Sequence, residues 1–349
     1  MAVTLKDIAR ACEVDVATAS RSLNGAYGVR AETRQRILDA ARRLQYRPNR
    51  IARGLVTGRS RTLAMVVGDI RNPFYAELAR GVEDAAYRAG YELVLCNCDL
   101  SSDRQMHYIH SLLEKRVDGI LLSAVARLNS AEQLELSRSD APIVLLNRPP
   151  GGARGYSTVL ADNYRGGWLA GETLAGLGHR KILLLADPRD NGNLAARETG
   201  FLKALQARSG GAAPLILRAQ HNSEGARHAL AEYLHARAQR RRLPAAPPRG
   251  AFTALFAVND AMAIGATRAI FEAGLNVPLD ISVIGFDDIE FSGMLRPPLT
   301  TIHQPKYEMG RAAVEILLRH VGKPAGWMPE HRTMEVRLVM RESCRALRA

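Results

Sequence analysis

Acidic side chains stand where predicted strands end or helices begin, and their chemistry is that of acid–base catalysis or of ligand binding. Asp287 and Asp288 follow one apolar run, and Asp162 precedes a predicted helix. Two adjacent residues at a strand end point in different directions, which argues against a working carboxylate pair. No nucleophile elbow, phosphate-binding loop, dinucleotide fingerprint or metal-ligand spacing accompanies them. We therefore predict that the chain is not an enzyme and that these residues bind a ligand.

Polar and aromatic side chains gather at the carboxyl ends of the predicted strands, where parallel α/β sheets bind ligands. Arg197 begins a predicted helix, where a cation opposes the helix dipole, so a ligand or a carboxylate is expected beside it. Aromatic rings surrounded by Arg, Asp and Asn suit a sugar with vicinal hydroxyls, although a purine or a phosphorylated sugar could use the same groups. The candidate effector-binding residues are Asn72, Phe74, Tyr75, Arg148, Asp162, Arg197, Asn259 and Asp287.

Several of these residues have an ordinary structural alternative. Phe74 and Tyr75 could pack in the core, and Asp162 could simply cap the helix that follows it. Asp260 and Asp288 also stand at strand ends, but we expect them to be structural.

Residues 4–24 predict two short helices joined by a tight turn, and a third helix follows. Thr4 with Asp7 three residues later is a capping-box pattern, and Asp15 can cap the second helix. The stripes expected to face inward are Leu5, Ile8, Ala9 and Cys12, then Val16, Ala19 and Leu23, then Ile37, Ala40, Ala41 and Leu44. Ala17, Thr18 and Arg21 stay free, as in a helix-turn-helix whose second helix lies in the major groove.

The basic balance of the chain is concentrated in its first 60 residues, which hold twelve Lys and Arg against five Asp and Glu. The remaining 289 residues carry only +6 of the total net charge of +13. Any small three-helix bundle has similar apolar stripes, but one dominant sign of charge is what phosphate binding needs. We therefore predict that this head binds double-stranded DNA.

After residue 60, apolar runs alternate with amphipathic stretches, which predicts parallel sheets covered by helices on both faces. The expected strands are Leu63–Val67, Leu93–Cys96, Ile120–Ser123, Ile143–Leu146, Ile182–Ala186, Leu215–Leu217, Ala254–Val258 and Val283–Phe286. Eight strands exceed one comfortable sheet, and residues 147–157 (NRPPGGARGYS) indicate a break. We expect an α/β protein with an all-α helix-turn-helix head and two α/β lobes that face each other across a cleft.

The composition suits a chain of two or three domains with sizeable cores, because 47% of its 349 residues are hydrophobic. The sequence has no apolar run of about 18 residues and no apolar signal segment, so we expect a cytoplasmic protein without membrane contact. Four cysteines suit a reducing compartment. Cys96 and Cys98 lack a matching Cys/His pair at ligand spacing, so we expect core packing and no metal or cofactor.

These features together resemble the LacI/GalR family of bacterial transcription regulators over nearly the whole chain. VTLKDIARACEVDVATASRSLN is similar to its DNA-reading motif, and YRPNRIARGLVTGRSRTLAMVV to its hinge and first core strand. AARETGF, AVNDAMAIGA and VIGFDDIEFSGMLRPPLTTIHQPKYEMG resemble effector-domain landmarks. The resemblance implies a homodimer and an effector domain similar to periplasmic sugar-binding proteins. The expected boundaries are 1–46 for the head, 47–60 for the hinge, 61–161 plus about 291–323 for the N-terminal lobe, and 162–290 plus about 324–349 for the C-terminal lobe.

The resemblance also implies a DNA-binding set. Val16 and Ala17 would meet base edges, Arg21 would pair with guanine, and Leu55 would be a minor-groove wedge. The set comprises Thr4, Val16, Ala17, Thr18, Ser20, Arg21, Asn24, Asn49, Arg50, Ala52, Arg53 and Leu55. Glu13 stands where the family usually has glycine at the turn, and it would be strained by about 1–2 kcal/mol at a positive φ.

The resemblance implies a sequence-specific regulator whose affinity for DNA is switched by a small effector. Arg197 and Asp287 match the family's effector-contacting positions most directly. Two heads related by a two-fold axis would read a pseudo-palindromic operator. We expect a repressor of carbohydrate genes with a sugar effector. The alternatives are a nucleobase or phosphorylated-sugar effector, or an activator.

Overall fold

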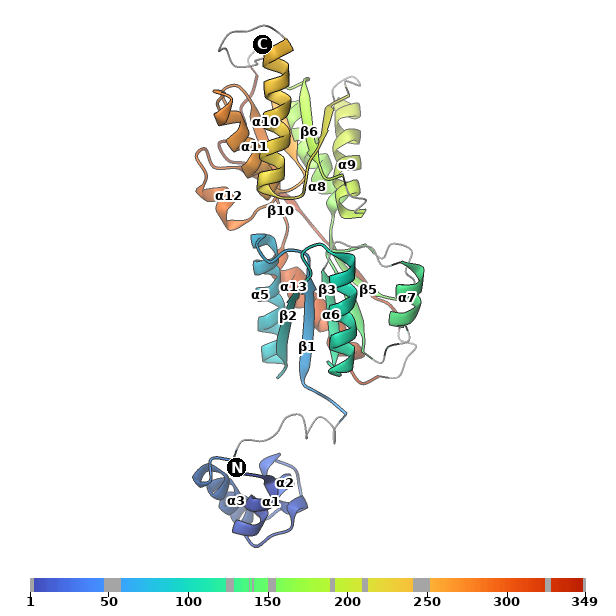
Figure 1. Ribbon diagram of the computed structural model, residues 1–349, viewed down its shortest axis with the longest axis vertical. Coiled ribbons are helices and arrows are strands. Elements are labelled where there is room, and N and C mark those ends of the chain that lie inside the picture. Colours follow the sequence, from blue (N-terminus) through green and yellow to red (C-terminus); the bar gives the residue numbers. More distant parts are fainter. Residues whose placement is uncertain are drawn as a thin grey trace. The chain divides into compact units, whose positions relative to one another are not determined.

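The computed structural model describes residues 3–46, 58–123, 129–137, 139, 141–149, 155–188, 192–208, 213–240, 252–323 and 328–347. The chain divides into two compact units, Met1–Ser60 and Arg61–Ala349, which are drawn in Figure 1. Most of the expected hinge lies outside the described residues. No helix among the described residues is both long and apolar enough to cross a membrane.

The first unit is a three-helix head with helices α1 (Leu5–Ala11), α2 (Val16–Leu23) and α3 (Ala31–Arg43). The predicted capping box is confirmed, because Thr4 and Asp7 bond each other's backbone amides. The buried residues of its core are Ile8, Ala9, Cys12, Ala19, Ile37, Ala40 and Ala41, with Leu5, Leu23 and Leu44 packed against them. The inward orientation expected for Val16 is wrong. Its side chain is 41% exposed because the second helix turns Ser22 inward beside Ala19, and Val16 lies outside that buried face.

The second unit contains two six-stranded sheets, one in each lobe, and the predicted α/β class is confirmed. The first-lobe sheet has the order β11-β5-β4-β3-β1-β2, and the second-lobe sheet has the order β12-β10-β9-β8-β6-β7. Neighbouring strands are parallel except β12, which runs antiparallel to β10. The strands are β1 (Thr62–Val67), β2 (Glu92–Asn97), β3 (Gly119–Ser123), β4 (Ile143–Leu146), β5 (Ser157–Ala161), β6 (Ile182–Ala186), β7 (Leu215–Arg218), β8 (Ala254–Ala257), β9 (Ser282–Asp287), β10 (Thr300–His303), β11 (His331–Met334) and β12 (Arg337–Val339).

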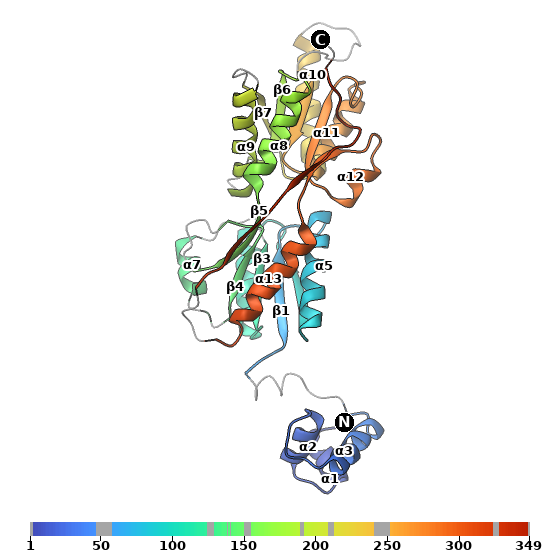
Figure 2. The ribbon, with the colours of Figure 1, turned by 180° about the vertical axis from the view of Figure 1, so that it is seen from behind.

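Helices cover both faces of the sheets, which explains why the central strands are almost entirely apolar. In the first lobe, α5 and α13 pack on one face and α6 on the other, as Figures 1 and 2 show from opposite sides. The helices of the second unit are α5 (Pro73–Arg88), α6 (Ser102–Glu114), α7 (Ser130–Ser137), α8 (Asn163–Gly176), α9 (Gly192–Arg208), α10 (Ser223–Arg240), α11 (Asp260–Glu272), α12 (Glu290–Met294) and α13 (Lys306–His320).

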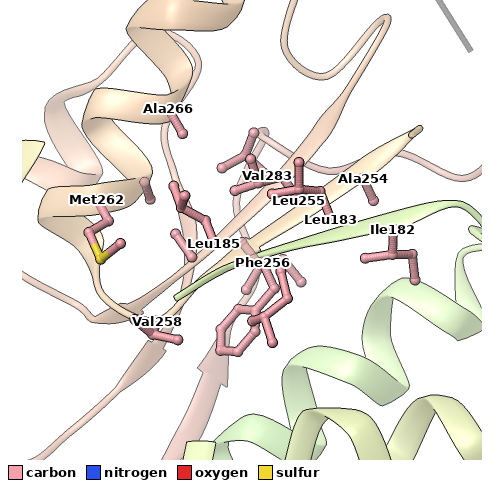
Figure 3. Packing of buried hydrophobic residues seen from close by; sticks show 14 of the residues in the cluster. Ile182, Leu183, Leu185, Ala254, Leu255, Phe256, Val258, Met262, Ala266 and Val283 are labelled. Atoms are coloured by element: carbon pink, nitrogen blue, oxygen red, sulfur yellow. The ribbon is translucent and has the colours of Figure 1, made fainter. Parts of the chain in front are cut away.

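The second-lobe core is centred on β6, β8 and β9, and Figure 3 shows its packing around Phe256. The Phe256 ring lies 4.8 Å from that of Phe201, measured between centroids, so α9 is joined to the sheet by an aromatic pair. In the first lobe, Cys98 is buried and Cys96 packs against the same cluster, as core side chains.

The expected lobe boundaries near 291 and 324 are wrong. Strand β10 pairs with β9 in the second lobe, and the chain enters the first lobe only at α13. Strand β11 still belongs to the first lobe through β5, and β12 returns to the second. These short strands lack an apolar run. In β10, Thr300 and Thr301 are buried because their hydroxyls find partners in Arg341 and Asp260.

Candidate functional site

The second helix of the head presents a polar, solvent-exposed face. Ala17, Arg21 and Asn24 are exposed beside Val16, while Thr18 and Ser20 are half-buried. Arg21 Nη2 donates to Thr18 Oγ1 at 3.1 Å, and Asn24 Nδ2 donates to Ser20 Oγ at 3.3 Å. Thr4 is exposed at the start of α1. The expected hinge contacts, Asn49, Arg50, Ala52, Arg53 and Leu55, lie outside the described residues.

The turn before this helix is held by a cap. The Asp15 carboxylate accepts bonds from Thr18 N and Thr18 Oγ1, both at 2.7 Å, and these bonds lower the pKa of Asp15. Glu13 has a φ of 50°, so the position expected to need glycine does adopt the left-handed conformation. The head therefore keeps the local geometry of a helix-turn-helix at the expense of backbone strain at Glu13.

A buried ionic group lies at the carboxyl ends of the second-lobe strands, and Arg197 on α9 is at its centre. Only 3% of Arg197 is exposed. Its Nε donates to Asn163 Oδ1 at 2.8 Å, and its Nη1 donates to Val258 O at 2.6 Å and to Asp287 Oδ1 at 3.3 Å. Helix α9 comes this close to α8 because Gly167 packs against the backbone of Arg197, where a Cβ would lie 1.9 Å from the carbonyl oxygen. The expected carboxylate partner of Arg197 is therefore Asp287.

Asp287 ends β9, and the oxygen that Arg197 contacts also accepts a hydrogen bond from Gln304. Gln304 Nε2 donates to Asp287 Oδ1 at 2.6 Å. Burial raises the pKa of Asp287, while the nearby Arg197 acts in the opposite direction. Within the described part of the chain, Asp287 Oδ2 and Arg197 Nη2 make no hydrogen bond. One acceptor and one donor are thus left over, and such a pair suits two neighbouring polar groups of a small molecule.

Asn259 belongs to a second polar group at the same edge of the sheet. Its Oδ1 accepts from Met262 N at 2.7 Å, which caps α11, and its Nδ2 donates to His221 Nε2 at 2.8 Å. His221 Nδ1 lies 3.2 Å from Asp187 Oδ2. Asp187 directly follows β6, and His221 lies three residues after the end of β7. Their position after a strand was therefore a signal that the sequence reasoning did not use.

Four further candidates divide into core, cap and site positions. Phe74 is buried in the first-lobe core, which was its structural alternative. Asn72 and Asp162 both cap helices, because their side chains accept from Phe74 N and Arg165 N. Half-buried Tyr75 makes an edge contact with Phe74 and interacts electrostatically with Arg197.

Arg148 lies near a buried amide of the first lobe. Its Nη1 is 3.4 Å from Gln105 Oε1, and Gln105 Nε2 is buried without a partner in the described structure. Asp260 is structural, as expected: it accepts from Ile289 N, Ser292 Oγ and Thr301 Oγ1. Burial raises the pKa of Asp260 to about 7.

Both units of the chain are similar to domains of known proteins. Residues 4–49 match bacterial regulatory proteins of the lacI family, and residues 172–344 match periplasmic binding protein-like domains. The HTH-type transcriptional repressor PurR of Aliivibrio salmonicida is 36% identical over 91% of this chain and 92% of its own length. A LacI family regulator of Enterococcus faecium with bound ribose is 32% identical over 82% of this chain and 100% of that one, with a TM-score of 0.71.

The lac repressor dimer, solved with its operator and the anti-inducer ONPF, has a TM-score of 0.83 at 27% identity and covers 99% of this chain and 100% of that one. A helix-turn-helix head followed by a two-lobed α/β unit therefore defines a DNA-binding regulator with an effector domain. The chain belongs to the lacI family of bacterial regulatory proteins, and the family resemblance is confirmed.

Proposed function

We propose that this protein is a homodimeric transcriptional repressor whose affinity for its operator is switched by a small molecule bound between the lobes. The observation that carries the proposal is the buried Arg197–Asp287 pair, to which Gln304 adds a hydrogen bond and with which Tyr75 of the other lobe interacts electrostatically. Burying an ion pair is expensive unless its remaining groups are satisfied. The unbonded oxygen of Asp287 and the unbonded nitrogen of Arg197 would be satisfied by the ligand.

We propose a sugar as the ligand. A pair of neighbouring hydroxyls can accept from Arg197 Nη2 and donate to Asp287 Oδ2 at once, and Tyr75 can pack against the sugar ring. The bound ribose in the E. faecium regulator supports this assignment. A purine is the second candidate, favoured by the similarity to PurR over nearly the full length. A purine would use the same donor and acceptor on its ring edge and would stack on an aromatic side chain.

On DNA, we propose that α2 lies in the major groove, with Val16 and Ala17 against bases and Arg21 paired with guanine. Thr4, Thr18, Ser20 and Asn24 would contact phosphates or bases around it. Each head carries few base-reading side chains, so two copies related by a two-fold axis would be needed for a specific site. Footprinting on operator DNA should show a pseudo-palindrome, and full affinity for one asymmetric half-site would contradict the proposal.

The test of the ligand site compares binding of D-ribose and of hypoxanthine to the wild type, Asp287→Ala and Arg197→Met. One of the two compounds should bind the wild type in calorimetry and change its affinity for an operator selected from random DNA. Asp287→Ala should abolish this response while ligand-free operator binding stays nearly unchanged. An undiminished response in Asp287→Ala would overturn the site, and the compound that binds decides between sugar and purine.

A further inference from the structure

Lys306 is buried in a place that is unfavourable for a cation. It is the first residue of α13, its exposed fraction is 0%, and it lies at the helix end where the dipole is positive. Lysine is almost never fully buried unless its charge is paired. A fully buried lysine therefore needs strong partners, and their identity indicates what it does.

The Lys306 ammonium group is surrounded by oxygen atoms from both lobes. Its Nζ donates to the carbonyl oxygens of Asp287 at 2.7 Å, of Asp288 at 3.0 Å and of Gln304 at 3.4 Å. Its charge is balanced by Glu77 Oε2 at 3.1 Å, and the Glu77 side chain on α5 is 43% exposed. We call Lys306, Glu77 and the carbonyls of Asp287 and Asp288 the lysine clamp.

The backbone held by the clamp is strained. Asp287 has a φ of 115° and Asp288 a φ of 55°, which are conformations that residues with a Cβ adopt rarely. Such conformations persist only when the surroundings fix them, and they concentrate at binding and switch regions. Asp288 is also tied by its side chain to His303 and Arg341. Among the described contacts, the hydrogen bonds from Lys306 are the ones that join these strained carbonyls to the first lobe.

We propose that Lys306 is a positioning residue of the effector site and that the lysine clamp transmits the state of Asp287 to helices α5 and α13 of the first lobe. This inference rests on the proposed function, because it takes Asp287 as the effector-binding carboxylate. Asp287 is held at its carboxylate by Gln304 and at its carbonyl by Lys306, and both residues lie on the short segment that enters α13.

Helices α5 and α13, which carry Glu77 and Lys306 of the lysine clamp, pack closely against each other. At Gly81 of α5, a Cβ would lie 2.1 Å from Tyr307 O, and Tyr307 Oη donates to Asp84 Oδ2 at 2.9 Å. Helix α5 also carries Phe74 and Tyr75 in its first turn. A shift of Asp287 on ligand binding would therefore move α13 and α5 together rather than be absorbed at the lobe boundary, since tightly packed elements transmit displacements.

The first experiment needs no ligand. Lys306→Met keeps most of the side-chain volume and removes the donor, so amide hydrogen exchange of residues 286–292 should speed up by at least about tenfold relative to the wild type. Lys203→Met is the matched control, because Lys203 is an exposed lysine of α9. Exchange in residues 286–292 that is the same in Lys306→Met as in the wild type would overturn the proposal.

The second experiment measures transmission and uses the compound, D-ribose or hypoxanthine, that changes operator affinity of the wild type. The readout is the ratio of operator Kd with and without that compound, which spans about 5–150-fold in coupled systems. Lys306→Met should bring the ratio to within about twofold of one, while affinity for the compound falls by less than about tenfold because Arg197 and Gln304 still hold the Asp287 carboxylate. A ratio equal to that of the wild type would overturn the proposal.

Glu77→Gln tests the clamp even if Lys306→Met fails to fold, because Glu77 is partly exposed and its change keeps Lys306 in place. In Glu77→Gln, the ratio of operator Kd with and without the compound should move toward one, as in Lys306→Met. The control is Glu83→Gln, because Glu83 lies on the same helix but pairs with Arg80, and this variant should keep the ratio of the wild type. An unchanged ratio in Glu77→Gln would count against the clamp. If neither compound affects the wild type, the proposed function fails and the transmission role fails with it, whereas the exchange experiment still decides whether Lys306 holds the strained backbone.

Discussion

The guanidinium carbon of Arg197 lies 3.6 Å from the centroid of the Phe286 ring, and both side chains are buried. A desolvated cation over an aromatic face is stabilised by about 2 kcal/mol. The ring also fixes the plane of the guanidinium, which then points Nη1 at Asp287. The edge of the same ring is bounded by Gly166 of α8, where a Cβ would lie 2.5 Å from Phe286 Cε2. The direction of Arg197 therefore depends on the absence of a side chain at Gly166.

Gly166→Ala should displace the Phe286 ring and, with it, Arg197. Overpacking of this kind destabilises a core by about 1–3 kcal/mol, so the thermal unfolding temperature should fall. Affinity for the effector should fall as well, because the donor is no longer aimed at the site. Calorimetry with the bound compound and a thermal melt measure the two effects.

Gly176→Ala is the matched control on the same helix, because a Cβ there meets nothing within 4 Å. It should be neutral or stabilise the protein by up to about 1 kcal/mol, and it should leave ligand affinity unchanged. Equal effects of the two substitutions would show that helix propensity, and not contact with Phe286, explains the result.

Arg21→Ala tests base reading by the head. Its exposed guanidinium is oriented by Thr18, and loss of one bidentate contact to guanine costs about 1–3 kcal/mol and relaxes preference at one base pair. Arg50→Ala, as a phosphate contact, should weaken binding to all sequences alike. Binding measured on the selected operator, on its single-base variants and on random DNA distinguishes the two. An equal loss on operator and random DNA for Arg21→Ala would exclude its role as a base reader.

The strands that could be predicted from the sequence are those that consist of a continuous apolar run. The expected Ile143–Leu146 and Ile182–Ala186 agree with β4 and β6 at both ends. Strands β5, β10, β11 and β12 were missed because polar residues interrupt their apolar runs. Their residues are placed by partners far away in sequence, as for Thr301, whose hydroxyl bonds Asp260. Helix α13 was also absent from the expected elements.

The sequence could predict which residues stand at the ends of individual strands, but not how these residues contact one another in the site. Arg197 and Asp287 do meet. The helix start expected at Arg197 is wrong, however, because α9 begins at Gly192 and Arg197 lies in its second turn. The identity of further partners could not be predicted, because Gln304 and Lys306 reach Asp287 through the crossing of the chain between the lobes. That crossing is a property of tertiary structure, and the expected boundary at 291 put it in the wrong place.

Glu13→Gly should stabilise the head. The residue adopts a φ of 50°, which glycine accepts without strain, so the gain is about 1 kcal/mol. For a domain of this size, that corresponds to a rise of about 4–8 °C in Tm. The measurement is thermal unfolding of residues 1–60, which form a compact unit with their own core. Glu13→Gln keeps the strain and removes only the charge, so a similar rise in that variant would refute the conformational explanation.

Asp288→Asn tests the ionic interactions of Asp288 with His303 and Arg341, just after the end of β9. Burial alone would raise the pKa of Asp288, but bonds from His303 Nδ1 at 2.9 Å and Arg341 Nη2 at 2.6 Å outweigh it and lower the pKa to about 2. The unfolded chain, with a pKa near 3.8, therefore binds more protons than the folded protein between these values. The stabilisation is complete above about pH 4 and is lost as the pH falls toward 2.

The contribution is about 1–2 kcal/mol, less than the full shift would give because Asp288 is partly open to solvent. At pH 7, Asp288→Asn should lower the free energy of unfolding by this amount, and about half of the difference should have disappeared at pH 3. Urea unfolding at a series of pH values measures it, with Asp103→Asn, an exposed carboxylate of α6, as the control. A difference between wild type and Asp288→Asn that stays constant down to pH 3 would mean that the lost stability comes from packing and not from the charge of Asp288.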